Sequence, residues 1–139
     1  MSLDQLYQRS ILEHNRAPRH YGRLQSTTHS ARGVDGLCGD NILIELQLVD
    51  DTIRRAMFSG EACAVTKASA SMLTSWIEGQ SRADALLAGR RFQAALKQPE
   101  IPDDPSFGEL NHLRAVSSFP ARLKNALLPW QVLIDALDQ

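Results

Sequence analysis

The alternation of polar and apolar residues between positions 41 and 59 constrains the fold of this chain more than any other feature. From Asn41 to Val49, apolar side chains occupy nearly every second position, which is typical of a strand with one buried face. Asp50-Asp51 predicts a turn, and Thr52 to Ser59 predicts the returning strand, with an irregular register that suggests a β-bulge. The segment therefore predicts an antiparallel β-hairpin.

The two cysteines of the chain flank this hairpin. Cys38 belongs to the sequence Cys38-Gly39-Asp40 before the first strand, and Cys63 follows Gly60 after the second. Because the two ends of a hairpin lie side by side, we expect Cys38, Asp40 and Cys63 to meet at one end of a sheet. Two thiolates and a carboxylate suit a site that binds metal or handles sulfur. A disulfide or two unrelated buried thiols are the alternatives.

Further elements are expected on both sides of the hairpin. Ala31 to Gly36 predicts an edge strand, which makes the sheet three-stranded. A capping box at Ser2-Leu3-Asp4-Gln5 predicts a first helix that ends near Asn15. A second helix is expected from Ala64 to Glu78. Cys63 would then lie at a helix N-terminus, where the helix dipole favours the thiolate.

The C-terminal half is expected to be helical. After a cap at Ser81, we predict one short helix that ends at Gly89 and another from Arg90 to Lys97. A turn or two of helix follows at residues 107–113. Ser118 is predicted to open a last helix that bends at Pro129, because proline lacks the N–H that would bond four residues back. The predicted fold class is α+β, a small antiparallel three-stranded sheet with helices packed on it.

Size and charge limit the function classes. The chain has 139 residues, of which 43% are hydrophobic, so we expect one domain over residues 1–139 with a packed core. Its net charge of −1 gives no basic field for nucleic acid. No apolar run approaches the ~20 residues of a membrane span, and the N-terminus does not resemble a signal peptide. We therefore expect a soluble cytoplasmic protein, whose thiols stay reduced.

Several motifs together resemble the U-type scaffold family of iron–sulfur cluster assembly, the SufU/IscU type. The resemblance runs nearly end to end. Its motifs are Leu6-Tyr7 with Ile11-Leu12-Glu13-His14, Pro18-Arg19 with Gly22, Cys38-Gly39-Asp40, Cys63-Ala64-Val65 within the segment from Gly60 to Ser71, and Phe119-Pro120-Ala121-Arg122-Leu123-Lys124 before Trp130. The long segment between Cys63 and the last helix, together with Lys124, resembles the SufU branch.

The resemblance implies an α+β fold and a site of three cysteines and one aspartate near the surface. Such a site holds zinc or a nascent iron–sulfur cluster and receives sulfur from a cysteine desulfurase. By position, Cys38, Asp40 and Cys63 are three of the four ligands. Cys38 is the implied sulfur acceptor, with Cys63, at the head of a helix, as the alternative. A cluster shared between two copies of the chain would supply four thiolates, so a homo-oligomer stays open as an expectation.

The chain departs from the family motif at the fourth ligand. The family places its third cysteine directly after Lys124, where this chain has Asn125. A neutral amide is a poor substitute for a thiolate on zinc or iron. Ala62 is a smaller departure, at a position where glycine is usual before the cysteine. The loss of a thiolate shifts the expectation from a stable scaffold toward a sulfur relay.

Three hypotheses of function follow. The first is an iron–sulfur assembly protein that accepts sulfur from a desulfurase and binds zinc, iron or a nascent cluster at Cys38, Asp40 and Cys63, acting as a scaffold or zinc-dependent sulfur carrier rather than a turnover enzyme. The second is a degenerate paralogue that binds the desulfurase or another assembly factor without holding a metal or cluster. The third is a cysteine hydrolase, for which no histidine has motif support. The histidines are His14, His20, His29 and His112.

Overall fold

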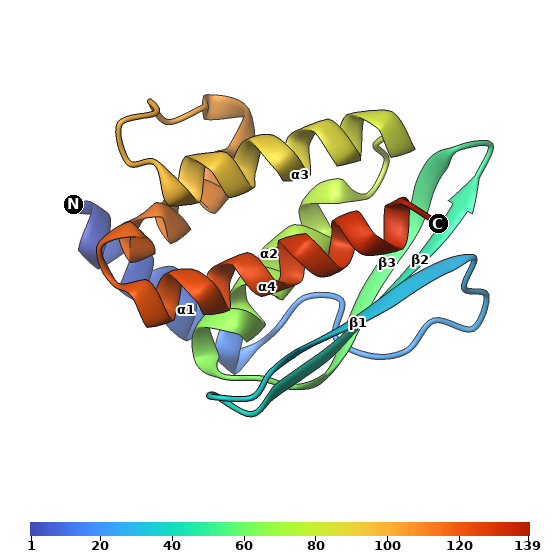
Figure 1. Ribbon diagram of the computed structural model, residues 1–139, viewed down its shortest axis with the longest axis horizontal. Helices are drawn as coiled ribbons and strands as arrows, with labels where there is room; N and C mark the ends of the chain where they lie inside the picture. The colour runs from blue at the N-terminus through green and yellow to red at the C-terminus, as the bar shows by residue number, and fades with distance from the viewer.

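The computed structural model describes residues 1–139 and has the predicted α+β architecture. A three-stranded antiparallel sheet is covered on one face by helices, and the other face is crossed by a loop (Figure 1). The elements in chain order are α1 (Leu3–Arg16), β1 (His29–Asp35), β2 (Asp40–Val49), β3 (Thr52–Glu61), α2 (Ala64–Ile77), α3 (Arg82–Lys97), the 3₁₀ segment η1 (Pro105–Ser118) and α4 (Pro120–Leu137). None of the helices has both the length and the apolar character needed to cross a membrane.

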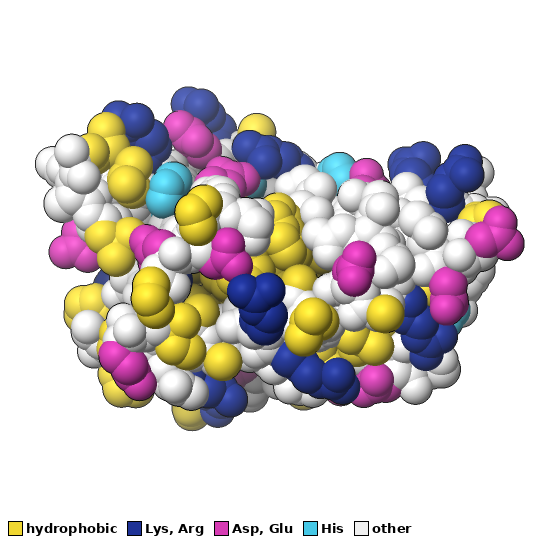
Figure 2. Space-filling model, turned by 90° about the horizontal axis from the view of Figure 1, so that it is seen from above, with side chains coloured by type: hydrophobic (Ala, Val, Ile, Leu, Met, Phe, Trp, Pro, Cys, Tyr) yellow, Lys and Arg dark blue, Asp and Glu magenta, His cyan; other side chains and the backbone are white.

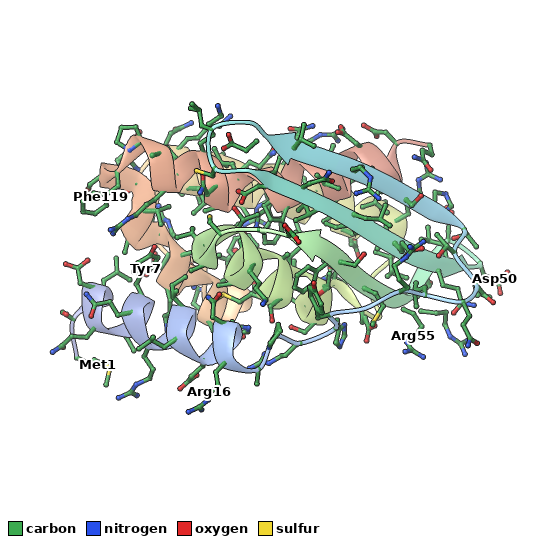
Figure 3. The ribbon with its side chains drawn as sticks, turned by 90° about the horizontal axis from the view of Figure 1, so that it is seen from below. Met1, Tyr7, Arg16, Asp50, Arg55 and Phe119 are labelled. Atoms are coloured by element: carbon green, nitrogen blue, oxygen red, sulfur yellow. The ribbon has the colours of Figure 1, made fainter.

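The sheet has the order β1-β2-β3, and its register confirms the predicted hairpin. Asp35 pairs with Asp40 at the β1–β2 turn, and Asn41 pairs with Glu61 at the far end of β3. The register shifts by one residue opposite Gln47 and Leu48, which is the predicted bulge in the returning strand. The β2–β3 turn at Asp50 therefore lies at one end of the sheet and the cysteine segments at the other (Figures 1 and 3).

The core lies between the sheet and the helices. The inward side chains of β2, Ile42, Ile44 and Leu46, are fully buried, since α4 packs on β1 and β2 and α2 packs on β3. An aromatic group centred on Trp130 joins α4 to α3, and the ring centroids of Trp130 and Phe92 are 4.6 Å apart. The N-terminal halves of α2 and α4 are joined by the bond from Ser69 Oγ to the backbone oxygen of Ala126, which brings both near the end of the sheet that carries the cysteines.

Glu45 differs from the sequence expectation. The strand pattern assigns it to the polar face of β2, yet only 5% of the residue is exposed. The loop between α1 and β1 covers it, and its carboxylate accepts hydrogen bonds from Arg23 Nε at 2.7 Å and Thr27 Oγ1 at 2.9 Å. These bonds hold the pKa of Glu45 below its ordinary value, although burial alone would raise it. The second face of the sheet is thus partly closed by a loop.

The C-terminal helices also differ from the prediction in two places. Residues 82–97 form one continuous helix, α3, rather than two helices divided at Gly89. Gly89 is buried within this helix and faces Ile134 of α4. The last helix begins at Pro120 with Phe119 as its N-cap, rather than at Ser118, and it continues through Pro129. Proline suits the first helical turn, because its missing N–H has no partner there anyway.

A buried polar network ties α1 to α2 and η1. His14 is only 2% exposed, and its Nδ1 lies 2.6 Å from Ser71 Oγ of α2, while its Nε2 lies 3.3 Å from a carboxylate oxygen of Glu109 in η1. The Arg19 guanidinium contacts Glu109 at 2.8 Å, and the Arg19 backbone N–H donates to Ser71. The hydrogen bond from His14 and the charges of His14 and Arg19 hold the pKa of Glu109 below its ordinary value, against the opposing effect of burial.

We predict that Glu109→Gln lowers stability at neutral pH and that the difference from the parent chain shrinks in acid. A carboxyl group with a depressed folded-state pKa contributes stability above its unfolded pKa and loses it as pH falls below about 4.3. Urea denaturation at pH 7 and at pH 3 measures the difference in unfolding free energy between the parent chain and the variant. Glu100→Gln is the matched control, because Glu100 is exposed and forms no ion pair. An equal difference in unfolding free energy at both pH values would contradict a stabilising role of the Glu109 carboxylate.

Candidate functional site

Cys38, Asp40, Cys63 and Asn125 come together at one end of the sheet. Cys38 lies in the turn between β1 and β2, Asp40 begins β2, Cys63 is the N-cap of α2, and Asn125 lies in the second turn of α4. In Figure 1 the β1–β2 turn, the end of β3 and the start of α2 lie together at the lower left, beside the first turns of α4. The structure thus brings together the residues that the sequence singles out.

Asp40 and Cys63 form the fixed part of the site. Asp40 is 2% exposed, and its Oδ1 accepts the backbone N–H of Cys63 at 2.7 Å. The Cys63 side chain makes no capping bond, and the Asp40 carboxylate on β2 instead accepts the backbone N–H of this N-cap residue. The Cys63 Sγ lies 3.8 Å from Asp40 Oδ2. The carboxylate therefore has a structural role in addition to any role as a ligand.

Thr66 is a site residue that the sequence argument missed. It is fully buried, and its Oγ1 donates to Asp40 Oδ2 at 2.5 Å and lies 3.3 Å from Cys63 Sγ. Its position could have revealed it, because a residue three positions after a helix N-cap lies above that cap on the same face. With both Asp40 oxygens hydrogen-bonded, the carboxylate is held in one orientation beside Cys63.

Asn125 lies between the two sulfurs. Its Nδ2 is 2.7 Å from Cys63 Sγ and 3.4 Å from Cys38 Sγ, and its Oδ1 lies 3.6 Å from Cys38 Sγ. Asn125 is only 6% exposed, so its amide is committed to these contacts. Its nitrogen donates to both sulfurs, and its oxygen accepts from the Cys38 thiol, so both ends of the amide are hydrogen-bonded within the site.

The two thiols differ in access. Cys38 is exposed, on a turn whose neighbour Leu37 is 89% exposed, whereas Cys63 is half-buried at the head of α2. Gly39 adopts a φ of +70°, a conformation that glycine takes at little cost. Cys38 is therefore the thiol that a large partner can reach, and Cys63 is the thiol held inside.

The donor set fits zinc only in part. No three side chains among histidine, cysteine, aspartate and glutamate lie close enough together in this arrangement to hold a metal ion. Asp40 and Cys63 contact each other, but Cys38 reaches the group only through Asn125. Structural zinc sites use four protein ligands. A metal held by Cys38, Asp40 and Cys63 would need the Cys38 turn to move inward and would keep an open fourth position.

A groove of about 480 Å³ lies beside the site, between α1, η1 and the first turns of α2 and α4. Tyr7, Val65, Phe119 and Arg122 are among its lining residues. Tyr7 and Phe119 lie at the end of the molecule opposite Asp50 (Figure 3). Burial raises the pKa of Tyr7, Arg122 opposes this and Cys63 adds to it, so the tyrosine lies within the electrostatic reach of the site.

The histidines do not support a cysteine hydrolase. His14 bonds to Ser71, His20 to the backbone oxygen of Ala56, His112 to Ser10, and His29 to Thr28. None of them hydrogen-bonds to either cysteine. A thiol nucleophile of that type needs an imidazole within hydrogen-bond reach as its base.

We predict that Gly60→Ala destabilises the chain and displaces Cys63. Gly60 has a φ of +111°, and a Cβ there would overlap the backbone oxygen of Asn41 on the paired strand. The expected loss is about 1–3 kcal/mol of unfolding free energy, measured by urea denaturation. Gly36→Ala is the control, since a Cβ there meets no atom, and it should change stability by less than about 0.5 kcal/mol. Equal stability of both variants would contradict the assignment.

The fold and the site define a small α+β domain that presents two thiols, a carboxylate and an amide at one end of a three-stranded sheet. Residues 6–126 match the model of the NifU-like N-terminal domain family. The chain belongs to this family, and the resemblance found in its motifs is confirmed.

Two relatives cover nearly the whole chain. The chain is 36% identical over 132 residues to the zinc-dependent sulfurtransferase SufU of Bacillus subtilis, covering 95% of this chain and 89% of that protein. It is 30% identical over 135 residues to the iron–sulfur cluster assembly scaffold protein IscU of Streptococcus pyogenes, covering 97% and 84%. These relatives support a role in iron–sulfur cluster assembly of the SufU/IscU type.

A solved structure agrees with the fold. The crystal structure of a putative iron–sulfur cluster assembly scaffold protein from Fervidobacterium islandicum superposes with a TM-score of 0.87, covering 96% of this chain and 97% of that one. At 24% identity this likeness supports the fold alone. The predicted three-stranded α+β fold is therefore confirmed independently of the site residues.

Proposed function

We propose that this chain is a cytoplasmic sulfur acceptor in iron–sulfur cluster assembly, which takes sulfur from a cysteine desulfurase onto Cys38. The observation that carries the proposal is the exposed Cys38 thiol on a turn, 3.4 Å from the Asn125 amide and beside a half-buried second thiol. A thiolate attacks the persulfide of a donor through its sulfur, so it must be reachable. Cys38 meets this requirement and Cys63 meets it less well.

The groove beside the site supports a protein partner. It joins apolar side chains of α1 and α4 to Arg122, whose guanidinium lies 5.0 Å from the Phe119 ring centroid. An aromatic side chain with an arginine is a common anchor in protein interfaces. Charges of both signs are interspersed over the face shown in Figure 2, so steering by one sign of charge has no support on that face. We propose that the desulfurase docks over this groove and brings its persulfide to Cys38.

Metal binding at the same residues is part of the proposal. Cys38, Asp40 and Cys63 would hold zinc, iron or a nascent cluster, whose supply of positive charge keeps bound thiols ionised. With one position open and Asn125 in place of a thiolate, we expect binding that is weak and reversible. A cluster held by four thiolates would require two copies of the chain.

Asn125 also favours a second candidate function. The chain lacks one thiolate, and the Asn125 amide occupies the space between the other two. Such a chain could bind the desulfurase without accepting sulfur from it. The two candidates differ in what they do to the partner. A sulfur acceptor removes sulfur from the desulfurase and so accelerates its turnover of cysteine to alanine, whereas a binding protein does not.

The experiment is therefore alanine formation by a cysteine desulfurase, measured with and without the reduced chain. An acceptor raises the rate in proportion to the concentration of the chain. Binding of the two proteins is measured in parallel by calorimetry. Binding without acceleration would support the second candidate and overturn the first, and absence of both would overturn the two together.

A further inference from the structure

The two sulfurs of the chain are neighbours. Contacts of 3.4 Å and 2.7 Å to the same Asn125 nitrogen place Cys38 Sγ and Cys63 Sγ within about 6 Å of each other. Both cysteines are free, and they are the only two in the chain. With an amide in the fourth position, no third thiolate competes for either sulfur. The site therefore contains an isolated dithiol.

The geometry lets the dithiol close. A disulfide needs sulfurs about 2.05 Å apart and Cβ atoms about 3.5–4.5 Å apart, so one sulfur must move inward. Cys63 is held by α2 and by the Asp40 carboxylate, which accepts its N–H. Cys38 lies on an exposed turn between Gly36 and Gly39, and a Cβ at either glycine would meet no atom. The turn has space around it, so Cys38 is the partner that moves.

We infer that Cys63 is a resolving thiol that releases sulfur from Cys38 as sulfide. This inference rests on the proposed function, which delivers the persulfide to Cys38. The Cys63 sulfur attacks the inner sulfur of the Cys38 persulfide and forms the Cys38–Cys63 disulfide. The bond between the inner and outer sulfurs breaks, and the outer sulfur leaves with the electron pair.

The step balances without a further reactant. The outer sulfur is reduced to sulfide, and the two cysteine sulfurs are oxidised to a disulfide. The thiol proton of Cys63 ends on the departing sulfur, so hydrogen sulfide is released. A cellular dithiol reductant then returns the disulfide to two thiols for the next cycle. Asn125 keeps both sulfurs in place by donating to each.

A matched pair of chains tests the step. Reduced parent chain and Cys63→Ser, freed of metal by a chelator, are treated without oxygen with inorganic polysulfide, desalted, and sampled over time. Remaining thiols and persulfides are blocked with iodoacetamide, and intact mass is recorded. Use of an inorganic donor separates this test from the proposed function, because no desulfurase takes part. Cys63→Ala serves as a second variant, and thermal denaturation confirms that each variant folds.

The parent chain is expected to lose both free thiols and to show the mass of an internal disulfide. Cys63→Ser and Cys63→Ala are expected to keep one extra sulfur atom on Cys38, with a persulfide lifetime at least about tenfold longer. A parent chain that keeps a Cys38 persulfide and a reduced Cys63, both then alkylated by iodoacetamide, for as long as the variants keep their persulfide would overturn the inference. A disulfide that forms equally fast without polysulfide would also overturn it.

Discussion

Cys38→Ser is expected to abolish the acceleration of desulfurase turnover. The increase in rate that the chain produces should fall at least about tenfold, which leaves the rate near that of the desulfurase alone. A serine hydroxyl keeps the size and the hydrogen-bonding capacity of the residue but cannot take sulfur as a thiolate does. Because Cys38 is exposed on a turn and only its side chain contacts Asn125, the substitution should leave the fold intact. The measurement is the initial rate of alanine formation at a fixed desulfurase concentration, with the chain in excess so that each copy accepts sulfur only once.

Cys63→Ser is the matched control for this prediction. Cys63 is half-buried, so its replacement should leave the first acceptance of sulfur at Cys38 unchanged, although the fate of that sulfur changes. If Cys38→Ser accelerates the desulfurase as well as the parent chain does, sulfur enters elsewhere and the proposed acceptor is wrong. If both variants lose all acceleration, the acceptor is the pair rather than the exposed thiol.

Asn125→Cys is expected to raise zinc affinity at least about a hundredfold. The substitution places a third thiol between Cys38 and Cys63, at the position from which the Asn125 amide now contacts both sulfurs. Three thiolates and the Asp40 carboxylate then supply the four ligands of a closed tetrahedral site. Competition with a coloured chelator at neutral pH measures the affinity, and elemental analysis gives the zinc content per chain.

Two control variants test whether the gain in zinc affinity comes from a thiol at position 125. One removes the amide without adding a thiol, and the other adds a thiol at a neighbouring position. Asn125→Ser removes the amide without adding a thiol and should not raise the affinity. Lys124→Cys adds an exposed thiol one residue earlier, on a different face of α4, and should leave the affinity near that of the parent chain. Equal affinities for Asn125→Cys and Lys124→Cys would contradict the assignment of residue 125 as the missing ligand.

Much of the fold could be predicted because its signals are local. The hairpin follows from a period-two pattern and an aspartate turn, and the first helix follows from a capping box, whose two reciprocal bonds between Ser2 and Gln5 are present. The division of α3 at Gly89 was wrong because glycine lowers helix propensity by only about 1 kcal/mol, and α3 packs on α4 on both sides of this residue. The burial of Glu45 depends on Arg23 and Thr27, which lie in a loop about twenty residues earlier in the chain. A local sequence pattern cannot predict such a contact.

The sequence could predict that the cysteines and Asp40 belong to the candidate site, but neither Thr66 nor the contacts among these residues. The hairpin brings Cys38, Asp40 and Cys63 to one end by topology alone. The hydrogen bond from Thr66 to Asp40 joins α2 to β2. It forms only at the angle between these two elements that the packing of the core produces. The groove beside the site likewise requires four elements from distant parts of the chain.

The sequence by itself determined most of the elements and the end of the sheet at which the two cysteines lie, because alternation and capping are properties of short segments. The resemblance to the family motif added the loss of a thiolate at position 125. Only the tertiary structure decided what Asn125 does. Its amide lies between the sulfurs because α4 packs across α2, where Ser69 Oγ donates to the backbone oxygen of Ala126 at 2.8 Å. That distance depends on how buried side chains fill the space between two helices, and short-range sequence patterns do not specify it.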